Sequence, residues 1–215
     1  MNAVWESHYA GLPAEGGAVS RCFMALEGVA WTGKRVLDVG CRRGKGVFKL
    51  SEQVGADGYV VGVDWRSDFV DAARAAAPAA LQRSGLPDSN MEFRVAFPED
   101  LAVAGLADAS FDVVYLNNVC VLFADPLQAL RECARVLVPD GLLVMEAPVA
   151  AQNPTAADLA AAYAEGDSLR AARPLQQLES WLSDAGFRRL SANARDFPSG
   201  NREAQTVILH AEKAN

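Results

Sequence analysis

Apolar and polar positions follow two periods along this chain. Short apolar runs, which are typical of buried strands, alternate with longer segments in which apolar residues recur every three or four positions, as on one face of a helix. The runs predict strands at 35–40, 59–64, 91–95, 111–116 and 142–146. The longer segments predict helices at 44–54, from Ser67 to just before Pro78, from Asp125 to Leu137, at 155–171 and at 174–185.

The order of these elements indicates the fold class. A strand, a helix and a further strand form a parallel pair joined by a crossover. The alternation therefore favours a doubly wound α/β fold with a mostly parallel sheet and helices on both faces. Two final apolar runs, at 187–195 and 204–212, are joined by a loop alone and predict an antiparallel hairpin. We expect a seven-stranded sheet in one domain over residues 1–215.

Composition and charge narrow the class of partner. Apolar residues make up 51% of the chain and charged residues 22%, as in a globular protein, and the formal net charge is −7. Nucleic-acid binding rests on a cationic surface, so this acidic balance argues against that partner. No stretch stays apolar for the ~18 residues that a membrane span needs, and the N-terminus shows no signal-peptide pattern.

The cysteines indicate neither a metal site nor a redox pair. The four cysteines are Cys22, Cys41, Cys120 and Cys133. None of them forms a CxxC pair, and this spacing suits neither structural zinc nor a redox disulfide. We therefore expect no metal and a reducing, cytoplasmic setting.

A glycine-rich turn after the first predicted strand is the strongest candidate for a binding site. The segment from Asp38 to Gly46 reads as the end of a strand, a turn and the start of a helix. Twenty-six residues after Asp38, the second strand ends in another acid, Asp64. Such a turn brings backbone N–H groups close to a ligand, and an acidic residue at the end of the next strand binds the hydroxyl groups of a ribose. The pattern predicts a nucleoside site.

Four segments give the chain a resemblance to class I S-adenosylmethionine (SAM) dependent methyltransferases over about 35–190. They are VLDVGCRRG at 36–44, VGVD at 61–64, SFDVV at 110–114 and RVLVPDGLL at 135–143. Within that superfamily the chain most resembles the branch of ubiquinone/menaquinone C-methyltransferases and arsenite methyltransferases. The resemblance implies SAM as the cofactor and a small-molecule acceptor of the methyl group, with no nucleic acid or membrane as partner.

The resemblance also implies roles for single residues. The turn 38–44 would approach the methionine part of SAM, and Asp64 would bind both ribose hydroxyls. Trp65 would lie against the adenine, Phe97 would stack on it, and Asn117 would line the methionine side. The implied cofactor-binding residues are Asp38, Gly40, Cys41, Arg42, Gly44, Asp64, Trp65, Phe97 and Asn117.

Two of these positions depart from the family pattern. Arg42 stands where the family has the middle glycine of its turn, and a positive φ there would cost an arginine about 1–3 kcal/mol of strain. Its guanidinium could instead reach the SAM carboxylate. Phe97 stands where many relatives have an aspartate for the adenine amino group. These departures motivate a second hypothesis, a non-catalytic SAM- or nucleoside-binding protein on the same fold.

A nicotinamide-dinucleotide (NAD) oxidoreductase is a third hypothesis. It also uses a glycine turn followed by an acid. The segments 110–114 and 135–143 and the terminal hairpin argue against it, because dinucleotide folds continue with parallel strands.

Candidates for catalysis are few. Glu146 ends the fifth predicted strand, at the edge of the sheet where ligands lie, and could serve as a general base. His8 is a second weak candidate. Trp5 and Tyr9, four residues apart, could close over the cofactor. We expect 1–33 and 148–173 to form a cap for a modest, partly apolar acceptor.

An arsenite acceptor fits the residues less well. The resembling enzymes hold the metalloid with several thiolates, one of them just after the fourth strand, where this chain has Asn118. Cys120 lies two residues later, and 150–215 contains no cysteine. We therefore do not expect arsenic methylation.

Overall fold

The structure, a computed structural model, describes residues 2–14, 24, 26–195 and 205–214. Cys22 lies outside the described residues. The described helices are α1 (Ala3–Ala10), α2 (Lys45–Val54), α3 (Ser67–Ser84), α4 (Pro126–Val136), α5 (Ala156–Glu165) and α6 (Leu175–Asp184), with short 3₁₀ helices η1 (Leu101–Ala104) and η2 (Cys120–Leu122). The described strands are β1 (Arg35–Val39), β2 (Tyr59–Asp64), β3 (Met91–Val95), β4 (Phe111–Asn117), β5 (Leu137–Val149), β6 (Phe187–Arg195) and β7 (Gln205–Lys213).

These strands form a seven-stranded sheet across the described part of the chain, in the order β3-β2-β1-β4-β5-β7-β6. β1 to β5 pair in parallel, and β7 inserts antiparallel between β5 and β6. The predicted fold class is therefore confirmed. The strand order reverses between β1 and β4, and in open α/β sheets ligands bind at the carboxyl ends of the strands at such a reversal.

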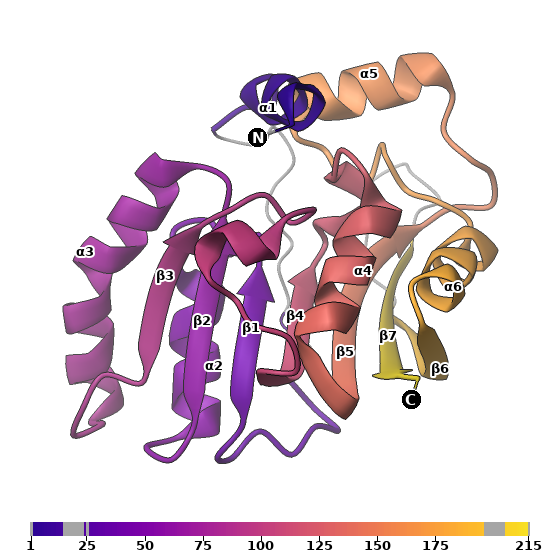
Figure 1. Ribbon diagram of the computed structural model, residues 1–215. Coiled ribbons are helices and arrows are strands. Elements are labelled where there is room, and N and C mark those ends of the chain that lie inside the picture. The colour runs from indigo at the N-terminus through magenta and orange to yellow at the C-terminus, as the bar shows by residue number, and fades with distance from the viewer. Residues whose placement is uncertain (1, 15–23, 25, 196–204, 215) are drawn as a thin grey trace.

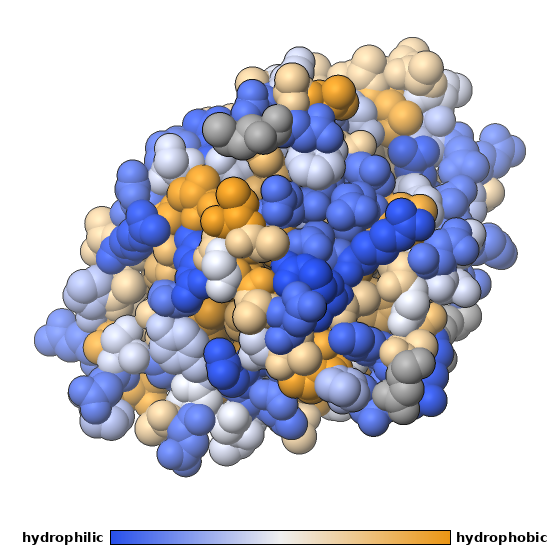
Figure 2. Space-filling view, in the orientation of Figure 1, coloured by the Kyte–Doolittle hydropathy of each residue, from blue (hydrophilic) through white to orange (hydrophobic). Residues whose placement is uncertain are grey.

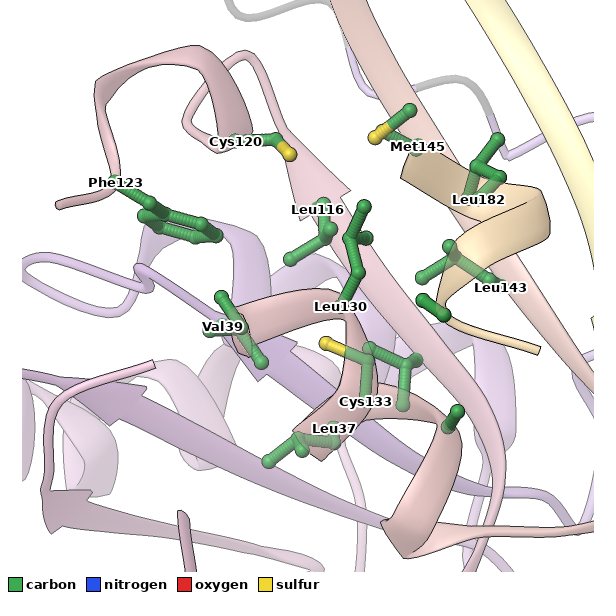
Figure 3. Close-up of a cluster of buried hydrophobic side chains, with 14 of the residues drawn as sticks. Leu37, Val39, Leu116, Cys120, Phe123, Leu130, Cys133, Leu143, Met145 and Leu182 are labelled. Carbon is green, nitrogen blue, oxygen red and sulfur yellow. The ribbon is translucent and has the colours of Figure 1, made fainter. Parts of the chain in front are cut away.

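Apolar side chains cover both faces of the sheet. On one face, Leu37 of β1 and Leu143 of β5 pack with Leu130 of α4 and Leu182 of α6 (Figure 3). On the other face, neighbouring strand positions pack with residues of α2 and α3, such as Val47 and Val70. Successive strand side chains point to opposite faces, so strands buried on both sides read as continuous apolar runs. Figure 1 shows the resulting layers, with α4 and α6 in front of the sheet and α2 behind it.

Helices α1 and α5 lie together beyond the carboxyl ends of the parallel strands (Figure 1). The two helices touch through the rings of His8 and Tyr163, whose centroids are 4.7 Å apart in an edge-on arrangement. Helix α5 begins with a capping box between Thr155 and Asp158 and ends at Gly166, where φ is +62°. Both helices therefore stand over the edge of the sheet where a ligand is expected.

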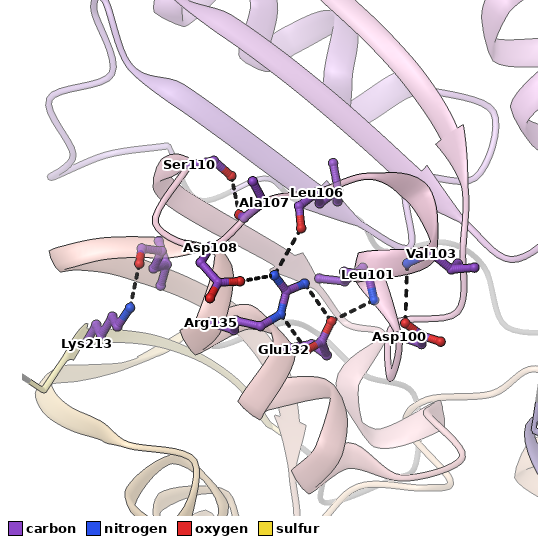
Figure 4. A network of polar contacts seen from close by, with 11 residues as sticks. Asp100, Leu101, Val103, Leu106, Ala107, Asp108, Ser110, Glu132, Arg135 and Lys213 are labelled. Atoms are coloured by element: carbon purple, nitrogen blue, oxygen red, sulfur yellow. Dashed lines mark hydrogen bonds and ion pairs between the residues drawn. The ribbon is translucent and has the colours of Figure 1, made fainter.

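An ion-paired arginine fastens the segment before β4 to α4 (Figure 4). Arg135 donates to Glu132 over 2.7 Å, to Asp108 over 2.6 Å and to the carbonyl oxygen of Leu106 over 3.0 Å. Glu132 in turn accepts the backbone N–H of Leu101 over 2.8 Å. This network fastens the chain between β3 and β4 to helix α4.

Three predicted boundaries were wrong. The helix predicted to stop before Pro78 runs on to Ser84, because Ala80 beyond the proline is buried and holds the last turns against the core. The strand predicted at 142–146 spans Leu137–Val149, because the residues before Leu142 continue it through a register shift with Asp140 at φ +58°. Helix α5 ends at Glu165, short of the predicted 171, because Gly166 terminates it.

The surface seen in Figure 2 is mostly hydrophilic, with an apolar area below α1. Two valines at that end of the sheet are well exposed: Val95 ends β3 with 41% of its surface accessible, and Val103 of η1 has 65%. Among the described helices, none combines the length and the apolar character that crossing a membrane requires.

Candidate functional site

The turn between β1 and α2 is anchored to the end of β2. The backbone N–H groups of Gly40 and Cys41 both donate to the carbonyl oxygen of Val63, over 2.8 and 3.0 Å. Gly40 and Gly44 have φ of +81°, which glycine adopts without strain. A β-carbon at Gly40 would lie 2.9 Å from Val119, which follows β4. Glycine thus lets the turn approach the neighbouring loop closely.

Arg42 adopts the left-handed conformation, with φ of +49°. The position therefore keeps the backbone of a glycine although its side chain is an arginine, and for a non-glycine residue this costs roughly 1–2 kcal/mol. The guanidinium donates to the carbonyl oxygen of Ala14 over 2.8 Å and lies 5.3 Å from the ring centroid of Phe69. Arg43 and Arg66 also stand against that ring, at 4.5 and 4.6 Å. The side chain of Arg42 is thus committed to the segment after α1 and to Phe69.

Two buried carboxyl groups lie behind this turn. Asp64 accepts the backbone N–H of Arg42 at Oδ2 over 2.9 Å and that of Arg66 at Oδ1 over 3.0 Å. Burial raises the pKa of Asp64 to about 6 against these two hydrogen bonds. Burial, and then the charge of Asp64, raises the pKa of Asp38 to about 7. Two backbone donors hold the Asp64 carboxylate in place, and two oxygens so oriented suit a vicinal diol.

The packing around Asp38 explains why residue 46 is a glycine. A β-carbon at Gly46, in the first turn of α2, would lie 2.5 Å from Oδ2 of Asp38. No L-side chain fits there unless the carboxyl group moves. The first turn of α2 and the end of β1 are therefore built around this acid.

Four aromatic rings from three distant parts of the sequence meet beside Asp64. Tyr9 of α1 stacks on Phe97, which follows β3, with ring centroids 5.2 Å apart and an interplanar angle of 14°. Tyr9 also lies against Trp65, which follows β2, with centroids 4.5 Å apart at 31°. Trp5 meets the edge of Phe97 at 6.5 Å. The structure therefore brings the sequence-predicted residues Trp65 and Phe97 to one place and adds Tyr9 between the segments that carry them.

Glu99 joins this aromatic cluster and was missed from the sequence. Its Oε1 accepts the Tyr9 hydroxyl over 2.7 Å and the backbone N–H of Asp125 over 3.0 Å. Glu99 is 1% exposed, and burial raises its pKa. Its Oε2 is buried and meets no donor among the described residues, and the indole N–H of Trp65 likewise meets no acceptor there. The sequence feature that could have indicated Glu99 is its position two residues after Phe97, in a segment that follows a strand.

The remaining polar candidates from the sequence, Asn117 and Glu146, lie on the neighbouring strands β4 and β5. Asn117, at the end of β4, is paired in register with Glu146 of β5, and its side-chain oxygen accepts from Asn118 over 3.0 Å. Glu146 is fully buried and accepts the hydroxyl of Tyr115. The candidate base thus belongs to a buried hydrogen-bonded pair.

His8 has a different setting. Its Nε2–H donates to the carbonyl oxygen of Leu122 over 2.8 Å, which ties α1 to η2. The ring is only partly buried. In the neutral tautomer with this hydrogen bond, Nδ1 remains an acceptor.

The environment of the described cysteines disfavours their thiolate form. Cys41, Cys120 and Cys133 are buried free thiols. Burial raises the pKa of Cys120 to about 12 and lifts the pKa of the other two well above the usual range. Within the described residues, no group of three or more metal-ligating side chains could hold a metal ion.

Comparison with known proteins places this chain in a family. Residues 32–192 match the family described as a methyltransferase domain. Two curated relatives are an arsenite methyltransferase of Aquipseudomonas alcaligenes, 40% identical over 52% of this chain and 32% of that protein, and the nocamycin O-methyltransferase of Saccharothrix syringae, 38% identical over 54% and 39%. The matched region thus spans about a third of the length of these curated relatives.

A solved structure extends the likeness to the whole chain. The arsenic(III) S-adenosylmethionine methyltransferase of Chlamydomonas reinhardtii superimposes with a TM-score of 0.74 at 25% identity. It covers 100% of this chain, which in turn covers 74% of that protein. The fold, including the terminal hairpin, is therefore that of a known methyltransferase.

Proposed function

This chain belongs to the SAM-dependent methyltransferase domain family, and from this premise we propose that it transfers the methyl group of SAM to a small organic acceptor. One observation carries the proposal: the buried Asp64 carboxylate, held by two backbone N–H groups beside a turn whose positions 40, 42 and 44 all have positive φ. That arrangement matches a ribose diol and a close backbone approach to the rest of the nucleoside.

The residues present fit SAM in charge and in hydrogen bonding. Asp64 would accept the two ribose hydroxyls, and the turn 38–44, which carries Gly40, Cys41 and Arg42, would line the methionine part together with Asn117. Trp65 and Phe97 would border the adenine. The Trp65 N–H and Glu99 Oε2 are buried and have no hydrogen-bond partner among the described residues, and they are a donor and an acceptor of the kind that an adenine edge satisfies.

The chain's own contribution to the reaction would be alignment and exclusion of water. When bound, SAM supplies a methyl group on a sulfonium, ready for in-line attack. The turn 38–44 and Asp64 would fix the direction of that methyl, and α1 and α5, joined through His8 and Tyr163, would close the edge above it. These helices lie in the segments 1–33 and 148–173, which we propose as the acceptor cap.

A base is needed only where the acceptor must lose a proton. His8 Nδ1 is the better placed of the two candidates, because His8 lies in the cap and is partly exposed. Glu146 is fully buried against Tyr115, which suits a structural role. We therefore propose His8 as the proton acceptor for any hydroxyl or amine substrate.

The thiols argue for an organic acceptor over arsenite. Relatives of this chain are named arsenite methyltransferases. Arsenite capture by thiolates needs cysteines that ionise, yet burial holds the pKa of each described cysteine high. Asn118 stands just after β4 with φ of +54° and offers no sulfur.

Calorimetric titration with SAM, S-adenosylhomocysteine (SAH) and NAD tests the cofactor. We expect micromolar binding of SAM and SAH and none of NAD. No heat from SAM or SAH at millimolar concentration would refute the proposal. Release of SAH in the presence of arsenite with a thiol, or of phenols, amines and carbon acids, then tests the acceptor. Turnover with arsenite alone would overturn the organic assignment.

A further inference from the structure

We propose that Tyr9 occupies the adenine subsite as a built-in competitor of the cofactor, and that Glu99 recognises the adenine amino group once Tyr9 leaves. This inference rests on the proposed function, because it concerns the same cofactor site. On this proposal the aromatic cluster beside Asp64 is a subsite with two alternative occupants, the ring of Tyr9 and the adenine of the cofactor.

The ring of Tyr9 lies where the adenine base of the cofactor would be expected. Trp65 and Phe97 follow the carboxyl ends of β2 and β3, one step beyond Asp64, where the base of a nucleoside held by Asp64 would lie. A flat ring already contacts both of them: its centroid lies 4.5 Å from that of Trp65 at an interplanar angle of 31°, and 5.2 Å from that of Phe97 at 14°. That ring belongs to Tyr9, which is 3% exposed. An adenine stacked against the same two side chains would need the volume that Tyr9 fills.

The hydrogen bonds of the Tyr9 hydroxyl also resemble those that an adenine could make. The Tyr9 hydroxyl donates to Oε1 of Glu99 over 2.7 Å and accepts the backbone N–H of Ala124 over 3.3 Å. The exocyclic amino group of adenine is a donor, and its ring nitrogens are acceptors. A purine in place of Tyr9 would therefore present a donor to Glu99, as the hydroxyl does now.

The carboxylate of Glu99 can accept a hydrogen bond from such a donor. Its Oε2 is buried and meets no donor within the described part of the chain. Departure of Tyr9 would also free one position on Oε1, while the Asp125 N–H, 3.0 Å away, would keep the carboxylate oriented. A buried carboxylate left short of donors is costly, so Glu99 favours whichever occupant supplies one. Phe97 itself supplies no polar group to a purine.

Helix α1 is held by few contacts, which makes exchange of the two occupants feasible. Beyond Tyr9 itself, the side-chain contacts of this helix and the turn after it with other described residues are His8 to Leu122, the His8–Tyr163 rings, the Trp5–Phe97 edge contact and the Arg42 bond to Ala14. Its remaining side chains, such as Val4, are largely exposed. A helix of eight residues has little stability of its own and depends on such tertiary contacts. A ligand that replaces Tyr9 therefore has to move one short helix only: α1 would shift far enough to withdraw the Tyr9 ring while staying over the edge of the sheet as part of the cap.

Titration of the full chain with SAH tests the competition. If Tyr9 must leave first, the apparent dissociation constant is raised by the fraction of molecules in which the subsite is filled. We expect Tyr9→Ala to bind SAH about tenfold or more tightly than the wild type, Tyr9→Phe to fall between them, and Val4→Ala, on the exposed side of the same helix, to match the wild type. Weaker SAH binding by Tyr9→Ala would show that Tyr9 is a wall of the pocket and would overturn the proposal.

Hydrogen exchange on the wild-type protein gives a second readout that needs no variant to fold. Saturation with SAH should speed amide exchange in residues 3–10, because α1 is displaced. Slower or unchanged exchange there, with SAH bound, would overturn the proposal. If neither the wild type nor any Tyr9 variant binds SAH, the proposed function fails together with this inference, whereas binding weakened only in Tyr9→Ala refutes the inference alone.

The role of Glu99 is tested by comparing SAH with its inosine analogue, in which a carbonyl replaces the amino group. In the Tyr9→Phe background we expect SAH to be preferred by roughly tenfold, and Glu99→Gln to bring the two ligands towards equal affinity. The glutamine still offers an oxygen to the Asp125 N–H, which preserves the fold. Equal discrimination with and without Glu99→Gln would exclude Glu99 as the recognising group.

Discussion

The backbone N–H of Arg42 donates to Oδ2 of Asp64 over 2.9 Å, so the residue with the unusual left-handed backbone directly orients the acid expected to bind ribose. The odd residue of the turn is thereby coupled to the residue with the clearest candidate role. Its side chain points to other partners, Ala14 and Phe69. Backbone and side chain of Arg42 can therefore be tested separately.

Replacing Arg42 separates these two contributions. Arg42→Gly removes both the backbone strain, about 1–2 kcal/mol, and the contacts of the guanidinium. Arg42→Ala removes only the contacts. We expect Arg42→Gly to change the unfolding free energy by less than about 1 kcal/mol, because relief of strain offsets the lost contacts and the greater freedom of glycine when unfolded. Arg42→Ala should be the less stable of the two in urea titrations.

The same pair reports on the cofactor. Tighter SAH binding in both variants is expected, because both release the segment after α1 from the turn. If both instead bind SAH more weakly, the guanidinium contacts the cofactor carboxylate in the complex.

Asp64→Ala should weaken SAM binding by about 1.5–3 kcal/mol, the scale of hydrogen bonds to a charged group. Isothermal titration calorimetry measures the loss. Asp68→Ala is the matched control: it removes an exposed carboxylate four residues away that pairs with Arg66, and it should leave SAM affinity unchanged. Equal losses in the two variants would indicate a general effect of charge and would leave Asp64 without its assigned role.

The raised pKa values of Asp38 and Asp64 predict a pH dependence of stability. In the folded protein these pKa values are about 7 and about 6, above those of an unfolded chain, about 3.9. Between pH 4 and 7 the folded state therefore binds more protons than the unfolded state, and stability falls as pH rises through this window.

Urea titrations of the ligand-free protein at pH 4.5 to 7.5 measure this slope. Asp38→Asn should flatten it, because the amide does not ionise and each unit of pKa shift corresponds to about 1.4 kcal/mol. An unchanged slope in Asp38→Asn would mean that other groups cause the dependence.

Tyr115 and Glu146 form a buried hydrogen-bonded pair, and a double-mutant cycle tests its role. Tyr115→Phe and Glu146→Gln should each lower the unfolding free energy by about 1–3 kcal/mol, and the double variant by less than the sum, because the two single variants lose the same buried hydrogen bond. SAH affinity should stay within a factor of about two. A full loss of turnover in Glu146→Gln with wild-type stability would restore Glu146 as the catalytic base.

Local patterns in the sequence were sufficient for the existence and order of the strands, for the terminal hairpin and for the glycine turn, because runs of apolar residues and turn residues are local, but they did not give the bounds of β5. Helix α3 beyond Pro78 was not predictable, since it depends on the packing of Ala80 against the core. The positive φ of Arg42 was open in the sequence and is settled by its contacts with Asp64 and Ala14.

Glu99 and the placement of Tyr9 could not be foreseen for a related reason. Their hydrogen bond joins residues 90 positions apart. Sequence spacing suggested that Trp5 and Tyr9 form a lid, but only the fold shows the Tyr9 ring against Trp65 and Phe97. Such contacts arise from the topology of the sheet and the path of α1 over it.

The insertion of β7 between β5 and β6 also bears on how the chain is made. A nascent chain that has emerged as far as β6 cannot yet join the two, because the strand that separates them is translated later. Until then β5 presents an open edge, and unpaired strand edges template aggregation. Vectorial synthesis therefore leaves a defined interval in which this half of the sheet is vulnerable. Chaperone demand during translation should concentrate in that interval and disappear once β7 has emerged.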